Sequence, residues 1–221
     1  DEHFPEVDLA LRRGRHVGRD DGTAYDYLVD ALDHLEPFYR RFGCELMQRA
    51  DGYFYLLPSG DRLGRRRLTA GEMLVGQTLA LMYLDPATLQ HGGMVQRETL
   101  LQRLSGLLGT ETLVRTLNPR RRKFDERIAA ETVRTKVAEA LRRLTDLGFI
   151  DSVDEAMLRL RPALMRFAEP VRDLSDQKAA LERLVKCGEI ALGEADEADE
   201  EDGDDGSDDD GTEDDEEEAG G

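Results

Sequence analysis

The sequence has 221 residues, with 48 Asp and Glu against 30 Lys and Arg, and its formal net charge is −18. Eighteen of the acidic residues and none of the basic ones lie in residues 194–221, so the body before them is charge-neutral. A body charge of −18 would argue against contact with nucleic acid, whereas an acidic tail on a neutral body leaves that contact open. The tail has no apolar periodicity and little hydrophobic surface, which predicts a disordered segment. Two roles are possible for this tail. It is either a solvated, self-repelling chain with no binding role, or a competitor for a basic or DNA-contacting surface.

The sequence lacks the features of membrane proteins, disulfide scaffolds and common enzymes. No apolar run reaches the roughly 20 residues of a membrane-spanning helix, so we expect a cytoplasmic protein with no membrane contact. Cys44 and Cys187 have no partner motif and are expected as free thiols. Neither a GxxxxGK[ST] phosphate loop nor a GxSxG motif is present, so we expect no enzyme, no catalytic residue and no cofactor. The histidines lie at no metal-ligand spacing, which predicts no metal, and His16 is expected to be a hydrogen-bonded turn residue between Gly14 and Gly18.

The first half begins with helical patterns. Residues 7–16 indicate one small helix followed by a turn. Pro37 lies within a second helical pattern and lacks an amide donor, so the helix is predicted to kink there or to restart with Pro37 in a new first turn. The apolar residues of this second pattern step by three and four positions, which places them on one buried face: Tyr25, Leu28, Leu32, Leu35, Tyr39 and Phe42.

A β-hairpin is predicted next. Strands at 44–49 and 53–58 flank Asp51 and Gly52, a pair that favours a two-residue turn. Alternate residues of the second strand point to opposite faces, and both sets are apolar or aromatic, so both faces require burial. We expect one face to pack on the helices and the other on a partner subunit. The candidates for this partner interface, with ordinary core packing as the alternative, are Tyr53, Phe54, Tyr55 and Leu57.

A second helical run follows a loop at 58–67 that is rich in Gly and Arg. Helices are predicted at about 70–84 and 97–108, with a short strand at Met94 and Val95 between them. The domain boundary is placed in the loop.

The most regular helix comes after residues 118–127. Gly148 is predicted to cap its C-terminal end, and a second hairpin follows around Asp154 and Glu155. Further helices are predicted at about 162–167 and 175–192. Four residues at helical spacing mark the buried face of the long helix: Val133, Val137, Leu141 and Leu144.

Both halves share one order of elements: a helix, a short extended piece, one or two helices and a two-stranded hairpin. This order predicts tandem winged-helix domains, a helix-turn-helix variant, in a mainly α fold with small β-hairpins (α+β). The pattern indicates fold better than function, because DNA-binding and protein-binding modules both use it. The predicted parts are an N-terminal winged-helix domain (1–68), a C-terminal winged-helix domain (69–167), a C-terminal helical extension (168–193) and a disordered acidic tail (194–221).

Basic residues gather before and on the flank of the long helix. They lie where a phosphate clamp would precede a recognition helix, and Arg side chains suit phosphate oxygens without reading sequence. Non-specific DNA contact in an assembled complex and a merely solvated loop are the two interpretations. The DNA-contact candidates are Arg120, Arg121, Arg122, Lys123, Arg127 and Arg134.

Four segments of the sequence resemble one known family. They are LALRRGRHVG (9–18), LEPFYRRFG (35–43), ELMQRADGYFYLLP (45–58) and EMLVGQTL (72–79). These segments are similar to MukE, the non-ATPase subunit of the MukBEF condensin, and the resemblance runs from about residue 7 to residue 192. It implies a nucleoid-associated homodimer of tandem winged-helix subunits that binds the kleisin MukF and the ATPase heads of MukB. Such a subunit supports chromosome condensation and segregation without hydrolysing ATP itself.

A free-standing dimeric winged-helix transcription regulator is the alternative hypothesis. A regulator needs a net basic recognition surface. The body is neutral, and Glu139 and Asp146 share the solvent face of Arg142 and Arg143 on the long helix. The sequence therefore favours the condensin subunit.

Overall fold

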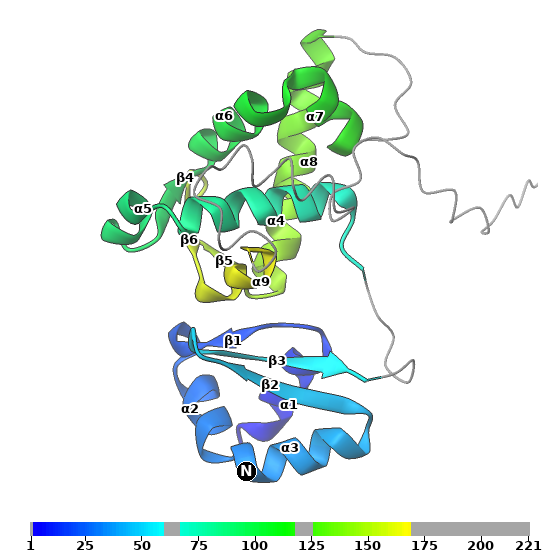
Figure 1. Cartoon of the computed structure of the whole chain (residues 1–221), viewed down its shortest axis with the longest axis vertical. Helices are drawn as coiled ribbons and strands as arrows, with labels where there is room; N and C mark the ends of the chain where they lie inside the picture. Colours follow the sequence, from blue (N-terminus) through cyan, green and yellow to red (C-terminus); the bar gives the residue numbers. More distant parts are fainter. Residues whose placement is uncertain (1, 60–66, 118–125, 169–221) are drawn as a thin grey trace, which may run out of the picture.

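The computed structural model describes residues 2–59, 67–117 and 126–168 (Figure 1). Within these ranges the chain is mainly helical and carries two small antiparallel sheets of three strands each. The predicted α+β class is therefore confirmed. In the same ranges no helix has the length and apolar character needed to cross a bilayer. The tail at 194–221 and the helix expected at 175–192 lie outside the described residues, as does Cys187.

The first half folds its helices against one face of its sheet (Figure 1). Strand β3 lies between β1 and β2, and both pairings are antiparallel. Leu28, Leu35, Tyr39 and Phe54 are buried in the core of this half. Its elements are α1 (Phe4–Arg12), β1 (Val17–Gly18), the 3-10 turn η1 (Arg19–Asp21), α2 (Thr23–Asp30), α3 (Leu32–Arg41), β2 (Cys44–Arg49) and β3 (Tyr53–Pro58).

Two local predictions in the first half are wrong. The restart at Pro37 is contradicted, because the helical pattern breaks at Ala31 and restarts at Leu32, which leaves Pro37 inside α3 and not in its first turn. The hairpin pairs Arg49 with Tyr53, which leaves a loop of three residues and not two. Gly52 in that loop has φ +86°, a left-handed conformation that glycine adopts without strain.

The second half is built around one buried helix, α4. Its sheet has the order β4-β6-β5, the same first-third-second arrangement as in the first half. Helices α5 and α7 are additional to the predicted elements. The elements are α4 (Ala70–Tyr83), α5 (Pro86–Gln90), β4 (Met94–Gln96), α6 (Arg97–Leu108), α7 (Thr110–Leu117), α8 (Glu126–Asp146), β5 (Ile150–Ser152), β6 (Met157–Leu160), η2 (Pro162–Leu164) and α9 (Met165–Ala168).

Helix α8 follows its predicted pattern closely. All four residues expected on its buried face are buried in the core of the second half. Gly148 follows the helix with φ +75°, and the amides of Gly148 and Phe149 donate to Thr145 and Leu144 carbonyls, which completes the C-terminal cap. The hairpin of β5 and β6 follows at the predicted place.

Helix α4 begins with a capping box and is then buried on all sides. Thr69 accepts a hydrogen bond from the Glu72 amide, and the Glu72 carboxylate accepts one from the Thr69 amide. The residues from Leu74 to Met82 are all buried. Such a helix requires small residues at close contacts, and Gly76 packs directly under the Phe167 ring.

We expect Gly76→Ala to lower the free energy of unfolding by about 1–3 kcal/mol, the range for overpacked cores. A Cβ at this position would lie 2.6 Å from the Phe167 ring. Gly106→Ala in α6 is the matched control, because a Cβ there meets nothing within 4 Å. The control should stabilise the protein by about 0.5–1 kcal/mol through helix propensity. Urea unfolding followed by circular dichroism measures both, and a destabilisation of equal size in the two variants would contradict the prediction.

Candidate interaction site at the joint between the two halves

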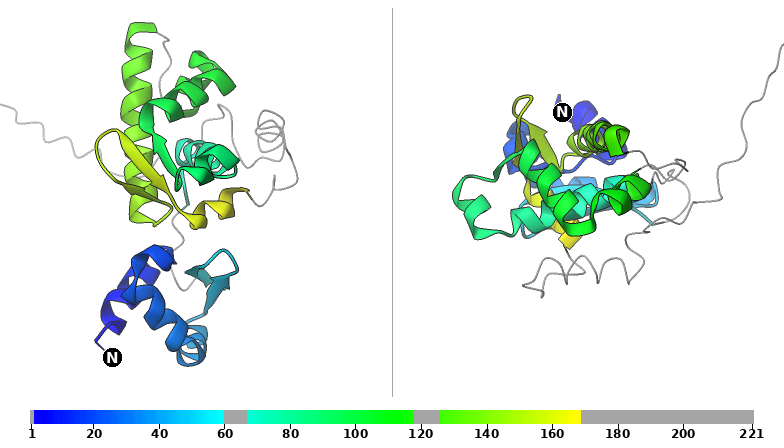
Figure 2. Two further views of the ribbon diagram at one scale, coloured as in Figure 1. Left: turned by 90° about the vertical axis from the view of Figure 1, so that its left-hand side faces the viewer. Right: turned by 90° about the horizontal axis from the view of Figure 1, so that it is seen from above.

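The two halves are stacked along the long axis of the molecule, and the first sheet faces the second half (Figures 1 and 2). Tyr53 and Tyr55 of β3 are buried in the core cluster of the second half, whereas Phe54 is buried in that of the first. The face of β3 expected to meet a partner subunit is thus covered by the same chain. Leu57, the fourth interface candidate, remains 41% exposed.

The loop after α1 attaches the first half to the end of α8. The His16 amide donates to the Leu147 carbonyl at 2.8 Å, and His16 Nδ1 donates to the same oxygen at 2.9 Å. A carbonyl only accepts, so Nε2 is the unprotonated nitrogen and accepts from Arg166 Nη1 at 2.8 Å. Arg15 Nη1 lies 3.3 Å from the Thr145 carbonyl and thereby satisfies part of the open C-terminal end of α8. His16 is a hydrogen-bonded turn residue, as predicted.

The surroundings of His16 keep its imidazole neutral. Burial, and after it the positive charge of Arg166, lower the pKa of His16 from 6.5 to about 3, while the bond to Leu147 opposes the shift. The Phe149 ring lies 4.3 Å from the imidazole, centroid to centroid, and the Arg166 guanidinium stands 4.1 Å from the centre of the Tyr55 ring. The histidine therefore serves the joint as a neutral hydrogen-bonding group.

Acidification should weaken the fold through His16 before it affects the carboxylates. Between pH 6.5 and about 3 the unfolded chain binds a proton that the folded imidazole does not, so stability falls as pH falls in this window. The slope is about 1.4 kcal/mol per pH unit, which amounts to about 2 kcal/mol between pH 7 and pH 5. His16→Gln should remove this part of the slope. Urea unfolding at pH 7, 6 and 5 measures it, and parallel pH dependences of the two proteins would contradict it.

Arg161 carries the second set of contacts across the joint. Its side chain is 2% exposed, and its Nη2 donates to Asp21 Oδ2 of the first half. Asp21 also accepts from the Gly18 amide at 2.8 Å and from Arg15 at 3.2 Å. Burial by itself would raise the pKa of Asp21, but the hydrogen bonds from Arg161, Gly18 and Arg15 outweigh it and hold the pKa below its ordinary value. The aspartate is therefore ionised opposite a buried guanidinium at neutral pH.

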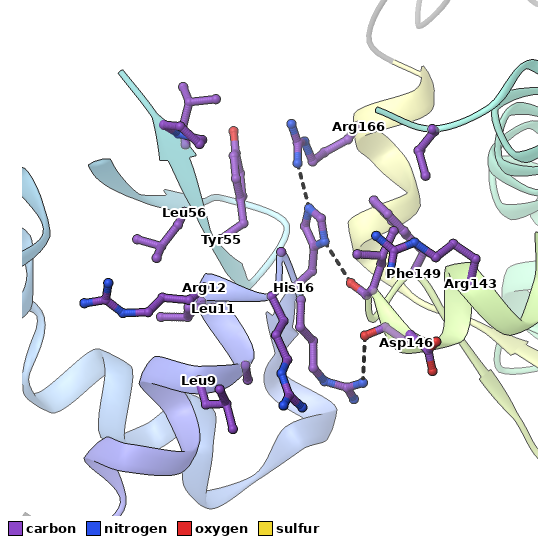
Figure 3. A pocket seen from close by; sticks show the side chains of 18 of the residues that line it. Leu9, Leu11, Arg12, His16, Tyr55, Leu56, Arg143, Asp146, Phe149 and Arg166 are labelled. Atoms are coloured by element: carbon purple, nitrogen blue, oxygen red, sulfur yellow. Dashed lines mark hydrogen bonds between the residues drawn. The ribbon is translucent and has the colours of Figure 1, made fainter. Parts of the chain in front are cut away.

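A cleft of about 1060 Å³ opens beside these contacts (Figure 3). Helix α1, the end of β3, the end of α8 and α9 all contribute to its lining. Two leucines in the lining, Leu9 and Leu57, are 49% and 41% exposed. The charged residues that line the cleft are Arg12, Arg13, Arg15, Arg143, Arg166, Glu6 and Asp146. With five arginines against two carboxylates, the cleft is suited to an anionic group that also carries apolar surface.

The structure places only part of the DNA-contact set. Residues 120–123 lie outside the described residues, and Arg127 lies in α8 without a described side chain. The exposed side chain of Arg134 has Nη2 3.7 Å from Glu98. On the same helix Lys136 Nζ lies 2.7 Å from Glu139. The described charges of α8 are thus partly neutralised by neighbouring carboxylates.

Sequence reasoning missed the residues that hold the joint together. Asp21 and Arg161 are 140 positions apart, and neither belongs to a recognisable motif. One signal was available: two glycines around a histidine indicated a tight turn, and Gly14 does have φ +83°. Among the described residues no group of three or more His, Cys, Asp and Glu could hold a metal ion.

Fold and site together define the class of protein. It is an α+β protein whose two halves share one order of elements, are held together by buried hydrogen bonds and an ion pair, and form a cleft rich in arginine. A family model for the condensin complex protein MksE matches residues 2–172. The chain is 34% identical to the chromosome partition protein MukE of Yersinia pseudotuberculosis over 189 residues, covering 84% of this chain and 80% of that protein. The MukE of Escherichia coli O157:H7 is also 34% identical, with coverages of 84% and 83%, and that of Pasteurella multocida is 35% identical, with 85% and 78%. The chain belongs to this family of condensin subunits.

Proposed function

We propose that this chain is a non-catalytic subunit of a MukBEF-type condensin that supports chromosome condensation and segregation. The observation that carries the proposal is family membership over residues 2–172, shared with relatives named for chromosome partition. The subunit dimerises, binds a MukF-type kleisin and contacts the ATPase heads of a MukB-type protein. It acts in the cytoplasm at the nucleoid and requires no cofactor.

The order of elements supports two winged-helix domains in this proposal. Each half runs helix, strand, helices and hairpin, and in each sheet the last strand pairs with both others. This is the arrangement of winged-helix modules. The first domain covers 1–68 and the second 69–167, followed by the extension at 168–193 and the acidic tail.

The charges of α8 favour a protein-binding role over operator recognition. A recognition helix needs free cations toward the groove, but Arg134 and Lys136 stand beside Glu98 and Glu139. Non-specific DNA contact then depends on the basic cluster at 120–123 and on tethering by the ATPase heads, because a weak site gains from high local concentration.

Co-purification tests the proposal. The full chain, the kleisin and the ATPase subunit of the same organism are mixed pairwise and analysed by size exclusion with light scattering. We expect the chain alone at twice its mass of 24.9 kDa and a quantitative shift into a larger complex with the kleisin. A chain that ignores the kleisin but retards a short DNA duplex would instead be a regulator, and the proposal would fail.

Leu57 offers a residue-level test of the partner interface. Leu57→Asp should weaken kleisin binding about tenfold or more if this exposed leucine is covered in the complex. Val153→Asp is the matched control, because Val153 is 54% exposed and does not line the cleft. Isothermal titration calorimetry with both variants distinguishes the site from a general loss of solubility, and equal affinities of the two variants would remove Leu57 from the interface.

A further inference from the structure

Two arginines of the cleft are free to bind a ligand. Arg12 is held by Asp8 at 2.8 Å, Arg15 by Asp21, and Arg166 by His16. The side chains of Arg13, from the end of α1, and of Arg143, from α8, by contrast make no hydrogen bond or ion pair within the part of the chain that the structure describes. They approach the cleft from opposite halves of the molecule, so one anionic segment in the cleft can meet both.

The chain itself supplies such a segment. Residues 194–221 hold eighteen carboxylates and no basic residue, and Ile190 and Leu192 stand directly before them. The apolar pair matches the exposed leucines of the cleft, Leu9 and Leu57, while the acidic run matches its excess of arginines. This combination distinguishes a polypeptide from a nucleic-acid backbone, which carries charge without apolar side chains.

The path of the chain makes the contact intramolecular. Phe167 lines the cleft, and the described chain ends one residue later at Ala168. As a coil, the 25 residues from 169 to 193 would span about 25–30 Å, which allows the residues after them to return to the cleft. A tethered segment at this range has an effective concentration in the millimolar range, which makes individually weak ion pairs sufficient for occupancy.

We propose that the acidic C-terminal segment of this chain folds back and occupies the cleft between the two halves, with its carboxylates on Arg13 and Arg143. The bound segment covers the arginines of the cleft and its exposed leucines, Leu9 and Leu57. A partner that binds the cleft more tightly than the segment does would displace it. Occupancy depends on salt, because ion pairs between exposed groups are screened within about 3 Å at 1 M ionic strength. This inference does not depend on the identity of the partner.

Site-specific photo-crosslinking in the full chain tests this proposal. A benzoylphenylalanine at position 9 or 57 replaces a leucine of the cleft, and the same residue at position 153 serves as the control. Lys186 is the last basic residue, so trypsin leaves 187–221 as one peptide that mass spectrometry identifies. We expect crosslinks from positions 9 and 57 to this peptide at low salt, none from position 153, and their loss in 1 M NaCl.

Charge reversal gives the second arm. Arg13→Glu with Arg143→Glu should reduce the crosslink yield about tenfold, because two attractions become repulsions. Arg41→Glu with Arg142→Glu makes the same change in net charge on exposed arginines outside the cleft and should leave the yield unchanged. Equal yields in the two double variants, or crosslinks to other segments, would overturn the proposal. Crosslinks between isotopically heavy and light chains would assign the cleft to the tail of a second copy and would also overturn it.

Discussion

Replacing Arg161 with alanine will lower the free energy of unfolding by about 3–5 kcal/mol, the cost of removing one partner from a buried ion pair. The guanidinium is 2% exposed and bonds Asp21 across the joint, with Asp151 3.7 Å away. Without it, the Asp21 carboxylate stays between the halves with less compensation, and the volume of the side chain becomes a cavity. Urea unfolding at pH 7, followed by circular dichroism, measures the loss.

Arg159 in β6 provides the matched control. It lies two residues before Arg161 and binds Asp151 through two hydrogen bonds, but its side chain is 45% exposed. Water screens such a pair, so Arg159→Ala should cost less than about 1 kcal/mol. If the two alanine variants lose equal stability, burial at the joint is not what makes Arg161 important.

A third variant separates charge from packing. Arg161→Met retains most of the length of the side chain but leaves Asp21 without its main hydrogen-bond donor. The folded pKa of Asp21 should then rise, and the stability that its ionisation contributes above its unfolded pKa should be lost. A methionine variant as stable as the parent would show that Asp21 is satisfied by Gly18 and Arg15 alone.

The sequence predicted those elements that depend on residues close to one another in the chain. The buried face of α8 follows from helical periodicity, and the cap at Gly148 follows from the preference of glycine for a left-handed conformation. Both hairpins lie at the predicted places, although the first has a loop of three residues and not two. The break at Ala31 has no such signal in the sequence, because neither glycine nor proline stands there. Pro37, where a kink or a restart was expected, lies within α3.

The contacts between the two halves could not be predicted from a single sequence. Alternation in β3 indicated two buried faces, but it could not distinguish a second subunit from a second half of the same chain as the covering body. Arginine is rarely buried, and no sequence pattern marks Arg161 as a buried residue. Its burial is explained by its ion pair with Asp21, which only the structure shows. In the described structure Tyr53 and Tyr55 lie in the interface between the two halves. The cleft beside them is open to solvent and can bind a ligand.

Gly148→Ala should be the most disruptive small substitution at the joint. A Cβ at Gly148 would lie 2.3 Å from the His16 carbonyl oxygen, and its φ of +75° disfavours any other residue. Parting the two backbones also breaks the His16 bonds to Leu147, so we expect a loss of about 3–5 kcal/mol. Gly109→Ala isolates the strain, because Gly109 has φ +73° with nothing within 4 Å of its Cβ, and should cost about 1–2 kcal/mol.

Hydrogen exchange shows where the loss of stability falls. The His16 amide donates to Leu147 across the joint, so its protection reports whether the two halves stay together, whereas amides of the buried helix α4 report the core of the second half. In Gly148→Ala the His16 amide should exchange faster while α4 stays protected, because the clash separates the halves before it unfolds either one. Gly109→Ala should leave the His16 amide protected. Equal loss of protection at both places would mean that the halves unfold as one unit and that the joint has no separate stability.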